Sequence, residues 1–191
     1  MAVETFFLFG FKALDDLITE TFPPSPENPL LRIVEKIESN QISDKEITKT
    51  LHDSIMKYME IGFQFKNLKF HFLKQLEPAY GHKIVLEIKT LKEITIEFIK
   101  SDQIINVEIA SKEDMSNFPI ISISIELIKK YFIEGLDVLR LITLNEIEID
   151  KFYDLNNIIV RALLGLSSAF FLRKEFRERV KRELNSLINS V

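Results

Sequence analysis

The side chains best suited to catalysis are three histidines and two serines. His52, His71 and His82 lie in different expected elements, and none has a second ligand-type residue at the spacing of a metal site. Ser122 and Ser124 alternate along an expected strand, without the G-x-S-x-G turn that exposes a nucleophilic serine. The chain also has no P-loop and no G-x-G-x-x-G motif. The sequence therefore predicts no catalytic residue, no metal site and no cofactor.

Two charged groupings have simple structural interpretations. His52 and Asp53 are adjacent on an expected helix, where consecutive side chains should point apart. Glu146, Glu148 and Asp150 share one face of a short expected strand, whereas a cation site needs carboxylates that converge from several directions. Charge on a short strand also prevents edge-to-edge pairing between sheets. We therefore expect His52 to be exposed or hydrogen-bonded, and the three acidic residues to be solvated at the edge of the sheet.

The composition predicts a soluble, folded chain. Its 191 residues are 46% hydrophobic and 28% charged, which is enough for one sizeable core. A net charge of −4 gives no electrostatic basis for a nucleic-acid partner. The absence of cysteine excludes disulfides and thiolate chemistry, and fits a reducing compartment. The bias toward Ile, Lys and Glu with few glycines resembles thermophile usage.

The start of the chain lacks the features of a signal peptide. Glu4 lies where a signal peptide needs positive charge, and no small-residue cleavage site follows the short apolar run. No apolar run reaches the roughly 20 residues of a membrane-spanning helix. We therefore expect a cytoplasmic protein.

The first part of the chain is predicted to be helical. Apolar residues recur at helical spacing in three segments: residues 4–21, 30–38 and 66–76. Ser43 and Glu46 form a capping-box pattern that begins a further helix. Four prolines follow the first of these helices: Pro23, Pro24, Pro26 and Pro29. This break predicts an N-terminal helical extension, residues 1–40, and a main domain, residues 41–191.

After Gly81 the apolar residues alternate with a period of two, which indicates strands. Three strands joined by tight turns are expected at residues 83–89, 93–99 and 103–109. A polar loop around Asp114 leads to a fourth strand, residues 119–125. The first three strands are therefore expected to form antiparallel hairpins.

Within residues 120–166 the spacing of the apolar residues switches several times between that of a strand and that of a helix. The fourth strand leads into a helix that Gly135 ends, because glycine adopts the left-handed cap conformation at little cost. Asp137 caps a second, short helix. A fifth strand, residues 146–150, follows, and Asp154 begins a long helix.

These elements predict the fold class. Neither a three-strand meander nor the helices can bury their apolar faces alone, so helices must cover one face of the sheet. We predict an α+β fold with a mostly antiparallel five-stranded sheet. The path from the fourth to the fifth strand passes through two helices, which predicts a right-handed crossover.

This order of elements resembles the sterol carrier protein type two family over residues 83–166. The family core has a three-strand meander, a fourth strand, two short helices, a fifth strand and a closing helix. The matching local pattern includes Gly135-Leu136-Asp137 between the two helices and the strand at residues 145–150. The places around the last strand where the family often has glycines hold Asn145, Lys151 and Phe152. We therefore expect a divergent member with a different turn there.

The resemblance implies a carrier that holds a sterol, fatty acyl or isoprenoid molecule in an apolar tunnel between sheet and helices, without catalysis. The 16 phenylalanines suit a core or an apolar pocket equally. Candidate lining residues lie on the helices that cover the sheet: Phe132, Leu136, Leu139, Ile142, Ile159, Leu163, Leu166 and Phe170. If these residues instead form a filled core, we expect an interaction or dimerisation module accessory to lipid or isoprenoid metabolism.

The segment Leu172–Val191 is predicted to be an amphipathic helix. Its apolar stripe comprises Leu172, Phe176, Val180, Leu184 and Leu187. The excess of Lys and Arg on its other side favours contact with an anionic membrane surface, and packing on its own domain or in a homodimer is the alternative. Residues 4–18 could likewise cover the pocket mouth, dock on a membrane or exchange with a second subunit.

Overall fold

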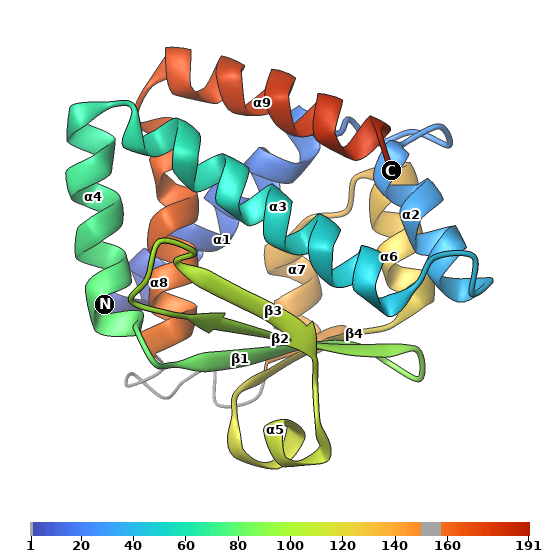
Figure 1. Cartoon of the computed structure of the whole chain (residues 1–191). Coiled ribbons are helices and arrows are strands. Elements are labelled where there is room, and N and C mark those ends of the chain that lie inside the picture. Colours follow the sequence, from blue (N-terminus) through green and yellow to red (C-terminus); the bar gives the residue numbers. More distant parts are fainter. Residues whose placement is uncertain (1, 150–157) are drawn as a thin grey trace.

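The computed structural model of the chain describes residues 2–149 and 158–191, with side chains from residue 9 onward. These residues form one sheet with a thick layer of helices on one face (Figure 1). Among the described helices, α5 (Lys112–Asn117) alone lies beyond the other face. The predicted α+β fold is confirmed.

The sheet is mixed, with antiparallel pairs in the majority. Its strands, in spatial order, are β3 (Ile105–Ile109), β2 (Lys92–Phe98), β1 (Lys83–Ile88), β4 (Ile120–Ile123) and β5 (Ile147–Ile149). The pair β1 and β4 is parallel, and the other described pairs are antiparallel. The predicted meander and the five strands are thus present.

The predicted crossover between β4 and β5 is wrong, because these strands are antiparallel neighbours. The two helices between them, α6 and α7, return the chain to the adjacent position in the sheet. The parallel connection runs instead from the meander to β4, which pairs with β1 and leaves β3 at the far edge. The alternation of apolar residues along a strand does not reveal which other strands pair with it, so the partners of β4 could not be predicted from it.

The strand register separates an apolar face from a polar one. Leu86 of β1 lies opposite both Ile94 and Ile121, and packs against the core. The next residue, Glu87, lies opposite Ser122, whose hydroxyl donates a hydrogen bond to it. Because successive strand residues point to opposite faces, this alternation places the apolar side chains under the helices.

The N-terminal helices begin where the sequence predicts. Asn28 caps α2 by accepting a hydrogen bond from the Leu30 amide at 2.9 Å, and Pro29 occupies the first helical position. The Ser43–Glu46 capping box at the start of α3 is confirmed. The bounds are α1 (Ala2–Thr21), α2 (Pro29–Glu38), α3 (Asp44–Phe63) and α4 (Lys66–Leu76). A 3-10 turn, Glu77–Ala79, follows α4.

The later helices differ from expectation in one place. The expected polar loop around Asp114 forms α5, with a capping box between Ser111 and Asp114. Gly135, with φ of 71°, ends α6, and Asp137 caps α7, as predicted. The bounds are α6 (Ile125–Glu134), α7 (Val138–Thr143), α8 (Ile158–Ser168), a 3-10 turn (Ala169–Phe171) and α9 (Lys174–Asn189). The expected helix start at Asp154, with Asp150, Lys151 and Phe152, falls outside the described residues.

An aromatic cluster centred on Tyr58 of α3 joins four helices. Its ring stacks on Phe72 of α4 with centroids 5.6 Å apart, and meets Phe176 of α9 edge-on at 5.2 Å. Its hydroxyl donates a 2.7 Å hydrogen bond to the carbonyl oxygen of Leu166 in α8. Burial raises the pKa of the Tyr58 phenol, so the group remains a protonated donor.

The first two helices share this core. Phe11, Phe22 and Ile37 belong to the same buried cluster as the aromatic residues of α4 and α9. Helix α1 packs on α8 and α9, and α2 packs on α6. The boundary predicted at residue 40 therefore lies within a continuously packed region, and an independent extension stays a prediction.

The close approach of α3 and α4 depends on Gly62. A Cβ atom at this position would lie 2.2 Å from Cε2 of the fully buried Phe72 ring. We expect Gly62→Ala to lower the free energy of unfolding by about 1–3 kcal/mol, the usual cost of overpacking. Helix propensity alone would instead favour alanine by about 0.5–1 kcal/mol. The sign of the change in unfolding free energy therefore distinguishes overpacking from helix propensity.

Urea denaturation measures this change. In the background of Phe72→Leu, which makes room beside residue 62, the Gly62→Ala substitution should cost much less. A stabilising Gly62→Ala substitution would contradict the steric account.

Candidate functional site

An apolar cavity of about 330 Å³ lies among helices α1, α2, α3 and α9 and reaches the sheet at Ile94 of β2. This volume falls within the range of roughly 300–1,000 Å³ that is typical of small-molecule sites. Residues of α1, α2, α3, α9 and β2, with Phe22 after α1, form its wall: Ile18, Phe22, Leu30, Ile33, Ile47, Thr50, Leu51, Ser54, Ile94, Leu184 and Ile188. Thr50 and Ser54 are the polar residues among them.

The cavity arises from the spacing of large and small side chains on α3. Ile47, Thr50, Leu51 and Ser54 recur every three or four residues, so they share one helix face. The small Thr50 and Ser54 leave space beside the larger pair. The Ser54 hydroxyl donates a 2.7 Å hydrogen bond to the backbone carbonyl oxygen of Thr50, which leaves the wall largely apolar.

Residues distant in the sequence meet in the wall of this space. Ile18 of α1 and Phe22 directly after it border the cavity together with Leu184 and Ile188 of α9. Several wall residues, including Ile18 and Leu51, are only half-buried, so the cavity lies near the surface. Of residues 4–18, Ile18 is the one that borders this cavity, and the three roles considered for that segment stay predictions.

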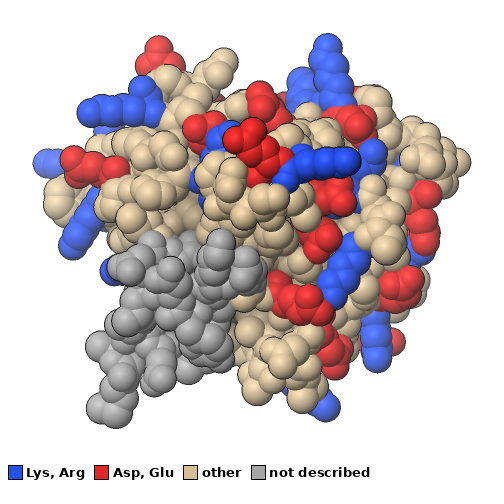
Figure 2. Space-filling model, turned by 90° about the horizontal axis from the view of Figure 1, so that it is seen from below, with Lys and Arg blue, Asp and Glu red and all other residues tan. Residues whose placement is uncertain are grey.

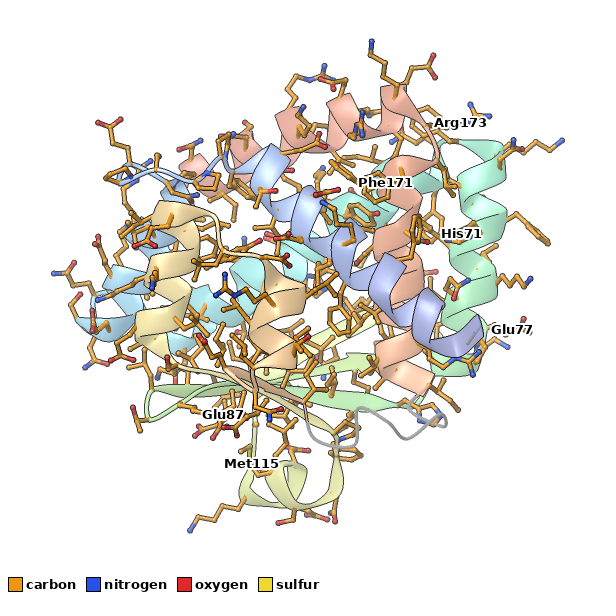
Figure 3. All side chains as sticks on the ribbon, turned by 180° about the vertical axis from the view of Figure 1, so that it is seen from behind. His71, Glu77, Glu87, Met115, Phe171 and Arg173 are labelled. Atoms are coloured by element: carbon orange, nitrogen blue, oxygen red, sulfur yellow. The ribbon has the colours of Figure 1, made fainter. Side chains whose placement is uncertain are left out.

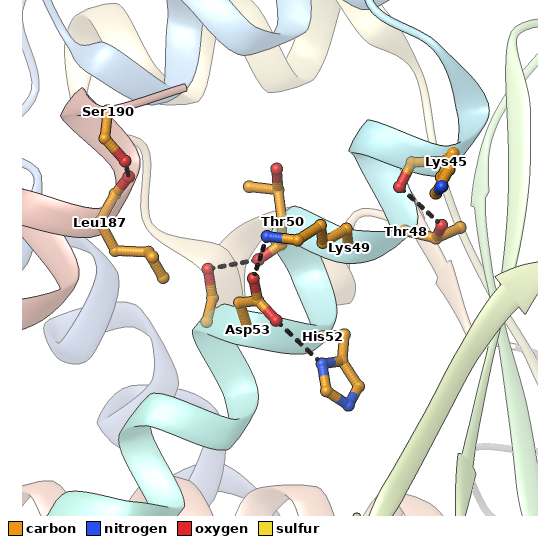
Figure 4. Close-up of polar contacts among 9 residues, drawn as sticks. Lys45, Thr48, Lys49, Thr50, His52, Asp53, Leu187 and Ser190 are labelled. Atoms are coloured by element: carbon orange, nitrogen blue, oxygen red, sulfur yellow. Dashed lines mark hydrogen bonds and ion pairs between the residues drawn. The ribbon is translucent and has the colours of Figure 1, made fainter.

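A polar pocket of about 290 Å³ shares one lining residue, Thr50, with the apolar cavity. Its lining comes from α2, α3, α9 and the residues next to them. Figure 4 shows part of it, with Lys49 and Asp53 of α3 near Thr50, and Leu187 and Ser190 toward the end of the chain. Its lining residues are Lys36, Gln41, Ile42, Glu46, Lys49, Thr50, Asp53, Leu187, Ser190 and Val191. The apolar cavity and the polar pocket therefore have Thr50 in common.

Two charged side chains of the polar pocket, Lys49 and Asp53, form an ion pair. Lys49 Nζ lies 2.8 Å from Asp53 Oδ2, and His52 Nδ1 lies 3.1 Å from Asp53 Oδ1 (Figure 4). The hydrogen bond from Lys49 and that with His52 lower the pKa of Asp53. The prediction that His52 and Asp53 point apart is wrong, because the short carboxylate turns back toward the ring nitrogen nearest the backbone.

The eight residues predicted to line a pocket lie elsewhere, and none of them borders the 330 Å³ cavity. Three are buried in the main core: Ile159, Leu166 and Phe170. Three are half-buried and pack against that core: Leu139, Ile142 and Leu163. The remaining two, Phe132 and Leu136, are half-buried at the end of α6 and just after it. A ligand site lined by these eight stays a prediction.

The histidine and serine nearest each other form a structural contact between α4 and α8. His71 Nε2 lies 2.8 Å from the carbonyl oxygen of Gly165, and Ser168 Oγ donates to the same oxygen at 2.7 Å. Figure 3 shows His71 on α4, beside α8. His71 Nε2 also lies 3.4 Å from Ser168 Oγ, but a ring nitrogen that donates to the carbonyl oxygen of Gly165 cannot at the same time accept the proton of the serine.

The outer sheet face carries interspersed charges on the part drawn in colour in Figure 2. Lys89 Nζ lies 2.6 Å from Glu148 Oε1, and the Glu148 side chain is 59% exposed on the edge strand β5. This agrees with the solvated interpretation of Glu148. No group of three or more His, Asp or Glu side chains that could hold a metal ion occurs within the described residues.

Neither a protein-family model nor a curated protein nor a solved structure matches this chain. The resemblance to the sterol carrier protein type two family thus rests on element order and stays a prediction. Across residues 2–149 and 158–191, no helix is both long enough and apolar enough to cross a membrane.

The lowered pKa of Asp53 has a measurable consequence. Its ionised form is favoured in the folded state, so it contributes stability above its ordinary pKa of 3.8, and this stability is lost as the pH falls through the folded pKa. We expect Asp53→Asn to cost about 0.3–0.5 kcal/mol at about pH 7, the range for exposed ion pairs on helices. The cost should shrink at about pH 3, below the ordinary pKa, and disappear only below the still lower folded pKa.

Urea denaturation at both pH values tests this dependence. Asp102→Asn, in an exposed turn and without an ion pair among the described residues, is the control and should have no effect at either pH. An equal cost of Asp53→Asn at both pH values would argue against the electrostatic origin.

Proposed function

We propose that this protein binds an apolar small molecule, of fatty acyl, isoprenoid or sterol-like character, without changing it chemically. The observation that carries the proposal is the 330 Å³ cavity, whose wall is apolar apart from Thr50 and Ser54. At Ile94, on the apolar face of β2, the cavity reaches the sheet. A pocket lined mainly by apolar side chains with a few polar groups is the usual form of a small-molecule site.

The order of elements supports the same proposal. The meander β1–β3, then β4, the helices α6 and α7, then β5 and α8 follow the pattern of the sterol carrier protein type two family. The binding energy would come from apolar burial, about 0.8 kcal/mol for each methylene group. Because binding also costs translational and conformational freedom, only the surplus becomes affinity.

Contact of the C-terminal helix with a membrane is not part of this proposal. The apolar stripe of α9 is buried against its own domain, chiefly on α3: Phe176, Val180, Leu184 and Ile188. This stripe would have to leave the core before it could enter a bilayer. Of the predicted stripe, Leu172 lies before the helix and is 54% exposed.

A second candidate function is self-association or association with an enzyme of lipid metabolism. Phe70 and Leu73, three residues apart on α4, are 73% and 44% exposed. Exposed neighbouring apolar side chains are a common feature of protein interfaces. Light scattering of the purified protein decides for this alternative if it gives a dimer that Phe70→Ser dissociates.

Filling the cavity tests the carrier proposal. Ser54→Phe places a ring within the apolar wall, and we expect it to weaken the binding of a fluorescent fatty acid at least tenfold, or about 1.4 kcal/mol. Ser186→Phe, on the exposed face of α9, is the matched control and should bind as the wild type does. Fluorescence titration of delipidated protein measures both affinities, and circular dichroism checks folding.

The dependence of affinity on the chain length of the ligand is a second test of the carrier proposal. Affinity should rise with each added methylene until the cavity is filled, and then level off. Absence of saturable binding to the wild type, or equal binding by Ser54→Phe, would refute the proposal.

A further inference from the structure

We propose that the outer side of α4 docks on an anionic lipid surface, with apolar side chains entering the bilayer interface and lysines contacting the lipid phosphates. This surface, the α4 face, comprises Lys66, Lys69, Phe70, Leu73 and Lys74. The inference goes beyond the proposed function, because it concerns the exterior of the protein and not the cavity.

Helix α4 carries apolar side chains on two sides. Those of its inner side, Leu68, Phe72 and Leu76, are buried where α4 packs on α3 and α8. On its outer side, Phe70 is 73% exposed and Leu73 is 44% exposed. These two lie three residues apart and are therefore neighbours on the helix surface. Figure 1 shows α4 at the outer edge of the helical layer, where a flat surface can approach it.

Lysines surround the exposed apolar pair. Lys66 lies one turn before Phe70, and Lys74 lies one turn after it. Lys69 lies one turn before Leu73. All three lysines are exposed, and α4 contains no acidic residue. The α4 face therefore combines apolar and cationic side chains.

The lysines of α4 differ from those of other helices in having no acidic partner. In the described part of the chain, the side chains of the three α4 lysines form neither an ion pair nor a hydrogen bond. The α4 face is thus positive, although the whole chain has a net charge of −4. Lysines on α1, α3 and α6 form ion pairs instead: Lys12 with Asp16, Lys49 with Asp53, and Lys129 with Glu38.

Positive charge continues from α4 onto α8. A pocket of about 300 Å³ lies between these helices, and its charged lining residues are Lys74 and Arg161. Arg161 is exposed and, among the described residues, has no ion pair. Glu77, directly after α4, is the nearest acid along the chain and is outnumbered by these cations.

This combination of side chains fits an anionic bilayer. Aromatic and aliphatic groups enter the boundary between headgroups and acyl chains, while lysine stems lie along apolar surface and their ammonium groups stay in water. Each lysine near an anionic surface strengthens binding about fivefold. No rearrangement is needed, because Phe70 and Leu73 are already exposed, whereas the apolar stripe of α9 is buried.

Protein partners fit this face less well. A second copy of the chain would place its own three lysines opposite these, and like charges repel. A different protein needs about 800 Å² on each side, or roughly 20–30 residues, for a stable interface. The α4 face has two exposed apolar side chains on one helix. Membrane binding instead grows with apolar area and charge together, so a small face suffices.

Co-sedimentation of the full chain with vesicles tests the proposal. We expect binding to vesicles of equal parts phosphatidylcholine and phosphatidylserine to be at least tenfold tighter than binding to phosphatidylcholine alone, and to weaken as salt is added. Combining Phe70→Ser with Leu73→Ser should weaken binding to the mixed vesicles at least tenfold. Combining Lys66→Gln, Lys69→Gln and Lys74→Gln should remove the preference for phosphatidylserine.

Matched controls lie on α6, on the opposite side of the helical layer in Figure 1. Lys130→Gln and Ile133→Ser change an exposed lysine and a 40% exposed apolar residue there, and should bind vesicles as the wild type does. Circular dichroism checks the folding of every variant. The α4 variants should keep the wild-type affinity for the fatty-acid probe, because α4 does not border the cavity.

Three results would overturn the inference: no sedimentation with mixed vesicles, equal binding to both vesicle types, or unaltered binding by the α4 variants. A dimer that Phe70→Ser dissociates would assign the α4 face to self-association and overturn it as well. Each of these results leaves the carrier function standing, since titration with the fatty-acid probe decides that function separately.

Discussion

The buried ring and hydroxyl of Tyr58 hold together the helices on which the candidate site depends. Its ring contacts α4 and α9, and its hydroxyl bonds to the backbone of α8, so α3 cannot shift against any of them without breaking a contact. An unpaired buried phenol would cost about 1–3 kcal/mol. Because α3 contributes residues to both the cavity and the polar pocket, this anchor holds one wall of each in place against α9.

Local signals in the sequence predict most of the elements. Ser43 with Glu46, Gly135 and Asp137 act within about one helical turn, so their effect can be derived without the rest of the fold. Helix α5 is missed because its capping box is followed by polar residues and by no apolar stripe. The neighbour of β4 is missed because strand pairing over long sequence separation is decided by tertiary packing.

The candidate site is harder to predict than the elements, since a cavity is a place that side chains fail to fill. The apolar residues of α6, α7 and α8 are visible in the sequence, but periodicity does not distinguish a filled core from a pocket wall. The space beside Thr50 and Ser54 exists only because α1, α2 and α9 pack at particular distances around α3. Nothing local to Thr50 marks it as the residue common to two spaces.

The presence of both α1 and α9 in the cavity wall has a consequence for biosynthesis. As the chain leaves the ribosome, α1 emerges early, while Leu184 and Ile188 follow every other part of the wall. Domains commonly begin to fold during synthesis, so a nascent form would have the sheet and most helices in place with one side of the cavity open. On the proposed function, the complete wall of the binding pocket therefore forms only after α9 has left the ribosome, and a shorter nascent chain exposes the apolar residues of that wall.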